Sequence, residues 1–91
     1  MNYRLAFTPQ AKEDFDFWKA TDAKTTERIR RMLKELQEHP FSGMGKPEAL
    51  RWQYSGAWSR RINRRDRMVY TVDGELVTVI VLALRYHYTA K

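Results

Sequence analysis

With 91 residues, of which 43% are apolar and 13% aromatic, the chain is too apolar to be disordered and long enough for one small domain, residues 1–91. The absence of cysteine excludes a disulfide framework and a thiolate metal site, and the two histidines stand far apart in sequence, so we expect no metal and no cofactor. The formal net charge of +6 indicates an anionic partner, and charge alone leaves open whether this is nucleic acid, an acidic protein or a membrane surface.

The first forty residues predict one strand and a helical hairpin. Residues 3–7 alternate between apolar and polar side chains, as in a short strand. Thr8 and Pro9 suit a helix start, because a threonine hydroxyl can cap free amides and proline at the first helical position gives up no needed donor. Asp22 can cap a second helix, which Pro40 ends. That helix has apolar residues at core-facing spacing: Ile29, Met32, Leu33 and Leu36.

The second half of the chain changes to the alternating pattern of strands. Residues 49–54 can form a short strand. In the next strand Trp58 and Ile62 share one parity, so Arg61 points to the opposite face of the sheet. In the strand after that, Arg67 again lies off the apolar parity. We therefore expect these two arginines on one face, away from the large apolar side chains.

The last strand completes the predicted fold. Asp73 and Gly74 are typical of a hairpin turn. Residues 76–84 are apolar on both parities, which predicts a central strand buried on both faces. The fold class is then α+β, with an N-terminal strand, a helical hairpin and a mostly antiparallel twisted sheet. No stretch is long and apolar enough for a signal peptide or a transmembrane helix, so we expect a soluble, cytoplasmic protein.

The most informative stretch is basic and contains few acids. Between Ser42 and Arg67 the only acids are Glu48 and Asp66. The basic residues there are Lys46, Arg51, Arg60, Arg61, Arg64, Arg65 and Arg67. Glu48 is either a local salt-bridge partner or a reactive group that neighbouring positive charge holds ionised. Residues 85–88 favour the second interpretation, because an imidazole and two phenols there follow the most apolar run of the chain.

Four blocks of sequence stand in a fixed order: residues 41–48 (FSGMGKPE), 55–62 (SGAWSRRI), 67–70 (RMVY) and 85–88 (RYHY). In these blocks and their spacing the chain resembles the YoeB toxins, members of the RelE/ParE superfamily of bacterial toxin–antitoxin systems. The likeness covers nearly the whole chain. Two features depart from the family pattern. Ala49 stands where a second proline is common, and residues 89–91 extend beyond the His-Tyr pair that often ends the chain.

The resemblance implies a RelE/ParE-like, microbial-RNase-like fold and a ribosome-dependent endoribonuclease that cuts mRNA in the A site. It also implies neutralisation by a YefM-type antitoxin, and it allows a homodimer. By the same resemblance Glu48 is the general base, His87 the general acid, Arg67 a stabiliser of the phosphate and Tyr88 a supporting group. Three further residues would bind the RNA substrate: Lys46, Arg51 and Arg61.

These residue types suit cleavage of RNA without a metal. A base takes the proton from a 2′-hydroxyl, which attacks the adjacent phosphorus, and an acid gives a proton to the leaving 5′-oxygen. A carboxylate and an imidazole fit the two proton transfers. Arginine fits the charge-rich phosphorane, because its planar guanidinium donates two hydrogen bonds to phosphoryl oxygens. The first product would be a 2′,3′-cyclic phosphate.

Two other functions compete with this one. A ParE-like toxin inhibits a topoisomerase by binding and cuts no RNA, and it does not require Glu48, His87 and Tyr88 together. A non-catalytic basic RNA-binding protein needs only lysines and arginines, so it leaves the lone glutamate of the basic stretch unexplained. The joint presence of the three residues therefore favours the nuclease.

Overall fold

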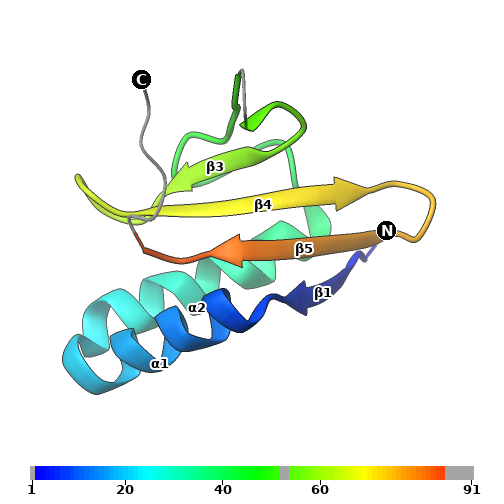
Figure 1. The fold of residues 1–91 in the computed structure, drawn as a ribbon. Helices are drawn as coiled ribbons and strands as arrows, with labels where there is room; N and C mark the ends of the chain where they lie inside the picture. Colours follow the sequence, from blue (N-terminus) through cyan, green and yellow to red (C-terminus); the bar gives the residue numbers. More distant parts are fainter. Residues whose placement is uncertain (1, 52–53, 86–91) are drawn as a thin grey trace.

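The computed structural model describes residues 2–51 and 54–85 and has two layers, a helical hairpin packed on one face of a five-stranded sheet (Figure 1). In chain order the elements are β1 (Arg4–Phe7), α1 (Pro9–Thr21), α2 (Ala23–Glu38), β2 (Glu48–Ala49), β3 (Trp58–Arg61), β4 (Arg67–Asp73) and β5 (Thr78–Ala83). The predicted α+β class is confirmed. Neither helix of the described chain has the length and apolarity that a membrane crossing requires.

The helix boundaries follow the predicted caps. The Thr8 hydroxyl accepts a hydrogen bond from the backbone N–H of Ala11 at 3.1 Å, and Pro9 is the first residue of α1. Asp22 separates the helices and caps α2, accepting from the N–H of Thr25 at 3.0 Å. That bond holds the pKa of the Asp22 carboxyl below its usual range. Helix α2 ends at Glu38, two residues before the proline expected to end it.

The sheet has the order β1-β5-β4-β3-β2. Strand β1 is parallel to β5, and the other neighbouring pairs are antiparallel, so the sheet is mostly antiparallel as predicted. The parallel pairing is possible because the helical hairpin carries the chain from β1 back to the other strands. Strand β2, at the far edge, is only two residues long.

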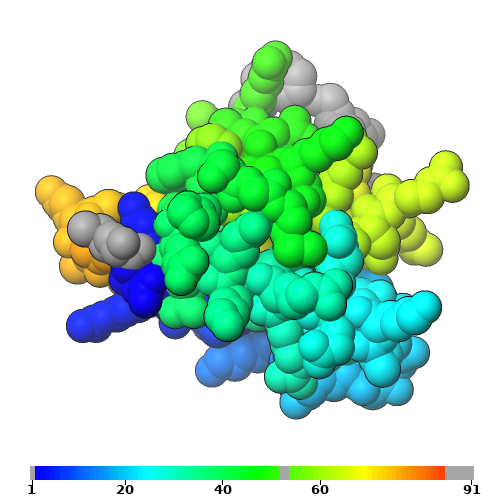
Figure 2. All heavy atoms as spheres, turned by 180° about the vertical axis from the view of Figure 1, so that it is seen from behind, coloured from blue at the N-terminus to red at the C-terminus, as the bar shows by residue number. Residues whose placement is uncertain are grey.

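The main core lies between the hairpin and the sheet. Its buried members come from both helices and from the helix-facing parity of the strands: Ala11, Trp18, Ile29, Met32, Leu36, Ile62, Met68, Tyr70, Val79, Val81 and Leu84. From behind, α2 and the loop that follows it form much of the surface, in cyan to green (Figure 2). The opposite face of the sheet carries a smaller apolar cluster of Ala57, Val69 and Ala83. We call it the open face, because neither helix of the described chain covers it (Figure 1).

Two predicted strands are shorter than expected. Of the predicted strand 49–54, Ala49 alone among the described residues belongs to a strand (β2), and the N–H of Tyr54 donates to the carbonyl of Arg51 at 3.1 Å, as in a turn. In 76–84, strand β5 begins only at Thr78, and Leu76 lies in the preceding turn with 68% of its surface exposed. The prediction of burial on both faces was wrong, because alternate residues of β5 (Thr78, Ile80 and Leu82) are only half-buried.

Candidate functional site

The open face of the sheet carries three of the predicted site residues. In the strand register Glu48 pairs with Ser59, and Arg61 pairs with Arg67. Paired residues of neighbouring strands point to the same face, and so do residues two apart along one strand. Glu48, Arg61 and Arg67 therefore share one face, as predicted for the two arginines. Glu48 and Arg61 are exposed, and Arg67 is half-buried.

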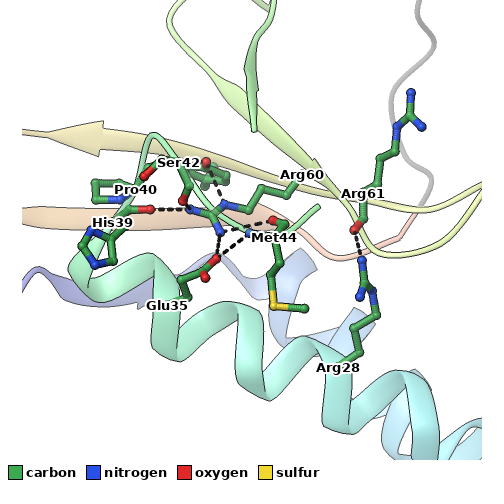
Figure 3. Close-up of polar contacts among 9 residues, drawn as sticks. Arg28, Glu35, His39, Pro40, Ser42, Met44, Arg60 and Arg61 are labelled. Carbon is green, nitrogen blue, oxygen red and sulfur yellow. Dashed lines mark hydrogen bonds and ion pairs between the residues drawn. The ribbon is translucent and has the colours of Figure 1, made fainter. Parts of the chain in front are cut away.

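The paired arginines give this face an unbalanced positive charge. Like charges directly opposite each other on neighbouring strands are destabilising. The guanidinium of Arg67 leans over the turn between β3 and β4, where its Nη1 donates to the carbonyl of Asn63 at 3.1 Å. Arg61 extends away from the helices (Figure 3). A phosphate near both groups would relieve the repulsion and accept charge-assisted hydrogen bonds.

Lys46 and Arg51 lie on either side of β2, and both are exposed. The segment before Lys46 is tied to β3, because the N–H of Arg61 donates to the carbonyl of Gly45 at 2.6 Å. Gly45 has φ +84°, and a Cβ there would lie 2.9 Å from the carbonyl oxygen of Arg61. Glycine is therefore needed for the close approach that brings Lys46 beside β3.

The predicted acid His87 and its neighbour Tyr88 lie outside the described residues. The last described residue is Arg85, whose guanidinium lies 3.5 Å from the centroid of the Phe17 ring. Such a contact is a cation–π interaction with α1. The chain therefore leaves the described part of the fold beside the first helix.

The end of β5 is anchored by two side chains of α1. Asp14 Oδ2 accepts from the backbone N–H of Leu84 at 2.9 Å, and Trp18 Nε1 donates to the carbonyl of Leu84 at 2.8 Å. Asp14, Trp18 and Leu84 are all buried. We call these contacts the Leu84 clamp. They fix the point from which the chain continues to residue 87.

A fully buried arginine on the helix-facing side of β3 holds the loop that leads to Glu48 (Figure 3). All five N–H donors of the Arg60 guanidinium are used. Nε donates to the Tyr70 hydroxyl at 3.2 Å, Nη1 to Glu35 Oε1 at 2.7 Å and to the Met44 carbonyl at 3.3 Å, and Nη2 to the Ser42 carbonyl at 2.8 Å and to the His39 carbonyl. We call Arg60, Glu35 and Tyr70 the Arg60 hub.

The two partners of Arg60 also bind the loop directly. Glu35 Oε1 accepts from the N–H of Met44 at 2.8 Å, and the Tyr70 hydroxyl donates to the carbonyl of Pro40 at 2.6 Å. Burial raises the pKa of Glu35, but the Met44 N–H and the Arg60 guanidinium outweigh it, so the pKa lies below the usual value. Burial raises the pKa of the Tyr70 hydroxyl, and Arg60 offsets this only in part.

The Arg60 hub was not predicted from the sequence, where Arg60 was counted only as one of the basic residues between Ser42 and Arg67. One signal was present, because Arg60 stands between Trp58 and Ile62 on the parity that carries the large apolar groups. An arginine at such a position must either reach past the core to solvent or find internal partners.

Two other features of the described chain bear on ligand binding, the lack of a metal-binding cluster and a cavity away from the open face. Within residues 2–51 and 54–85, no three His, Asp or Glu side chains gather closely enough to hold a metal ion. A separate apolar hollow of about 330 Å³ lies over β1 and the two helices, lined by Phe7, Lys12, Phe15, Asp16 and Leu33. None of these described lining residues is a predicted site residue.

Comparison with known sequences gives one consistent result. Residues 7–88 match the family model of the YoeB-like toxins of bacterial type II toxin–antitoxin systems. The chain is 52% identical over 82 residues to "Toxin YoeB" of Mycobacterium bovis, covering 90% of this chain and 94% of that one. It is 36% identical over 85 residues to "Toxin YoeB" of Escherichia coli K12, covering 93% and 99% of the two chains.

Solved structures agree with the sequence comparisons. A YoeB/ParE toxin from Agrobacterium tumefaciens superimposes with a TM-score of 0.88 at 39% identity, covering 93% of this chain and 99% of that one. A YoeB dimer from Staphylococcus aureus gives a TM-score of 0.84 at 36% identity, with 97% and 100% covered. The toxin in a heterotetrameric YoeB–YefM complex from the same organism gives 0.83, also at 36% identity, with the same coverage.

Proposed function

Because the chain belongs to the YoeB-like toxins of bacterial type II toxin–antitoxin systems, we propose that it is a ribosome-dependent endoribonuclease that cuts mRNA in the A site. The observation that carries the proposal is the common face of Glu48, Arg61 and Arg67. A carboxylate on the same face as two arginines paired across neighbouring strands combines a proton acceptor with a site for a phosphate. Since its target is the ribosome, the proposed place of action is the cytoplasm.

In this mechanism Glu48 takes the proton of the 2′-hydroxyl as that oxygen attacks the phosphorus. Arg67 donates hydrogen bonds to the phosphoryl oxygens, whose negative charge grows in the transition state. His87 gives a proton to the leaving 5′-oxygen, and Tyr88 supports its orientation. Attraction of the RNA backbone falls to the basic residues that frame the face: Lys46, Arg51 and Arg61.

The proposed partners follow from the relatives. The Staphylococcus aureus toxins occur as a dimer and in complexes with YefM. We therefore propose that this chain binds a YefM-type antitoxin and can form a homodimer. The net charge of +6 supports an antitoxin whose contact segment is acidic.

The test replaces each proton-transfer group while keeping its shape. Glu48→Gln and His87→Gln should each slow single-turnover cleavage on programmed ribosomes by about 10²- to 10⁴-fold, while ribosome binding survives. Primer extension would locate the cuts. Wild-type rates in both variants would overturn the acid–base assignment, and cleavage of free RNA at the same rate would overturn the dependence on ribosomes.

The role of Arg67 is tested by exchanging one cation for another. Arg67→Lys keeps the charge but loses the planar guanidinium, so a transition-state contact should cost about 10- to 100-fold in rate with binding unchanged. Arg64→Lys, at an exposed position in the turn after β3, is the matched control and should be nearly silent. Equal rates for Arg67→Lys and wild type would leave Arg67 as an RNA-docking charge only.

A further inference from the structure

The loop between α2 and β2 contains almost no secondary structure, yet its backbone is held at many points. Five of its carbonyl groups accept hydrogen bonds from β3 or β4. Arg60 donates to those of His39, Ser42 and Met44, the Tyr70 hydroxyl to that of Pro40, and the Arg61 N–H to that of Gly45. Buried carbonyl groups need such partners, and here one side chain supplies three of them.

The same loop is held from its other side by α2. Glu35 accepts from the N–H of Met44 and carries the ion pair with Arg60, which has no exposed side-chain surface. Gly43 has φ +116°, and a Cβ there would lie 2.1 Å from Glu35 Oε1. The Phe41 ring packs on Trp58 with 4.9 Å between centroids. The loop is therefore fitted closely around the Arg60 hub (Figure 3).

The part of this loop that these bonds hold, residues 39–45, ends three residues before Glu48. Strand β2 is only two residues long and lies at the edge of the sheet, so its own ladder holds Glu48 weakly. The position of Glu48 then depends on what holds the chain before it. The loop bonds of Arg60 and Tyr70, together with the bond from Arg61 to Gly45, provide that support.

We propose that Arg60 is a positioning residue for the endoribonuclease reaction, holding residues 39–45 so that Glu48 faces the phosphate bound by Arg67. The inference rests on the proposed function, in which Glu48 is the base. Arg60 itself touches no substrate, because it is buried on the opposite side of β3 from Arg61. Only arginine has five N–H donors in one plane, so lysine cannot reproduce these contacts.

The first test is a double-mutant cycle with Glu48. Arg60→Lys should lower the single-turnover cleavage rate at saturating ribosomes by about 10- to 100-fold, with ribosome binding changed little. In the Glu48→Gln background the same substitution should cause almost no further loss, because it acts through Glu48. An equal loss in both backgrounds would overturn the proposal. Arg65→Lys, the same exchange at an exposed turn position, should keep wild-type activity.

The second test does not depend on nuclease activity. In the isolated toxin, hydrogen exchange at the Met44 amide should quicken about 10-fold or more in Arg60→Lys, while amides in the middle of β4 keep their protection. Unchanged exchange in the loop would overturn the positioning role. If Glu48→Gln cleaved at the wild-type rate while Arg60→Lys still quickened exchange in the loop, the proposed function would be rejected. The conclusion that Arg60 holds the loop would stand.

A milder variant covers the case in which Arg60→Lys does not fold. Tyr70→Phe keeps the ring in the core and removes only the hydroxyl that joins Arg60 to the Pro40 carbonyl. It should slow cleavage by a few-fold to about 10-fold, again without effect in the Glu48→Gln background. Loss of rate that is independent of Glu48, or no change in rate or in Met44 exchange, would contradict the proposal.

Discussion

The Arg60 hub and the Leu84 clamp hold two segments of the candidate site by different means. The hub places a buried positive charge under a loop and uses five hydrogen bonds, three of them to groups outside regular strands and helices. The clamp uses one carboxylate and one indole N–H, both presented by a helix, to hold the end of a strand.

The difference reflects how much of each segment is already ordered by its own backbone. The end of β5 continues a ladder with β1 and β4, so two more bonds suffice to fix it. Residues 39–45 have no ladder, and their carbonyls must be satisfied one by one. A guanidinium with five donors suits that task, at the cost of burying a charge that needs a carboxylate partner.

The largest expected effect comes from removing that partner. Glu35→Ala leaves the Arg60 guanidinium buried without its counter-charge and the Met44 N–H without its acceptor. We expect a loss of about 3–5 kcal/mol in the free energy of unfolding, measured by urea denaturation. Glu38→Ala, one turn away at an exposed position, should stay within about 0.5 kcal/mol of wild type. A loss below about 1 kcal/mol for Glu35→Ala would show that the loop carbonyls alone compensate the charge.

Breaking the clamp should cost less, because no charge is left unpaired. Asp14→Ala leaves the buried N–H of Leu84 without its acceptor, which should destabilise the fold by about 1–3 kcal/mol in the same assay. Asp16→Ala is the control, since Asp16 is exposed and forms a surface ion pair with Lys19. The losses of Glu35→Ala and Asp14→Ala should add, because among the described residues Glu35 binds Met44 and Arg60 whereas Asp14 binds Gln10 and Leu84. A large deviation from additivity would mean that the two anchors are coupled.

Strand parity was enough to predict one part of this site and not the other. Arg61 and Arg67 alternate with large apolar residues, so their common face could be predicted from the sequence. Arg60 has the same side chain, yet its burial depends on Glu35 of α2 and on carbonyls of a loop, contacts that no local pattern encodes. Likewise the end of the strand in 49–54 depends on a turn that apolar alternation does not reveal.

The contribution of the Arg60 hub to stability should depend on pH. The pKa of Glu35 is raised by burial but lowered further by the Met44 N–H, by Arg60 and by the charge of His39, and so falls below its usual 4.5. A lowered pKa in the folded state means that the ion pair stabilises the fold above pH 4.5, and that this contribution is lost as the pH falls through the folded-state pKa.

Unfolding free energies between about pH 3 and 6 should therefore decline less steeply in Glu35→Gln than in wild type. The cap residue Asp22 also has a lowered pKa and contributes with the same sign. Asp22→Asn gives the size of that separate contribution and serves as the comparison. Parallel curves for wild type and Glu35→Gln would show that the ionisation of Glu35 adds nothing to stability.

The smallest expected effect lies where the described chain ends. Arg85 stacks on Phe17, and this contact extends the Leu84 clamp by one residue toward His87. A double-mutant cycle of Phe17→Leu and Arg85→Gln should give a coupling of about 0.5–1 kcal/mol in the free energy of unfolding. Phe15 is the matched control, because its ring also lies near cations, Lys19 and Arg30, but these come from the helices. Phe15→Leu should therefore show no coupling to Arg85→Gln.

If Arg85 directs the chain toward His87, Phe17→Leu should also slow cleavage by a few-fold, while Phe15→Leu leaves the rate unchanged. A coupling near zero would confine the anchoring of this segment to Asp14 and Trp18.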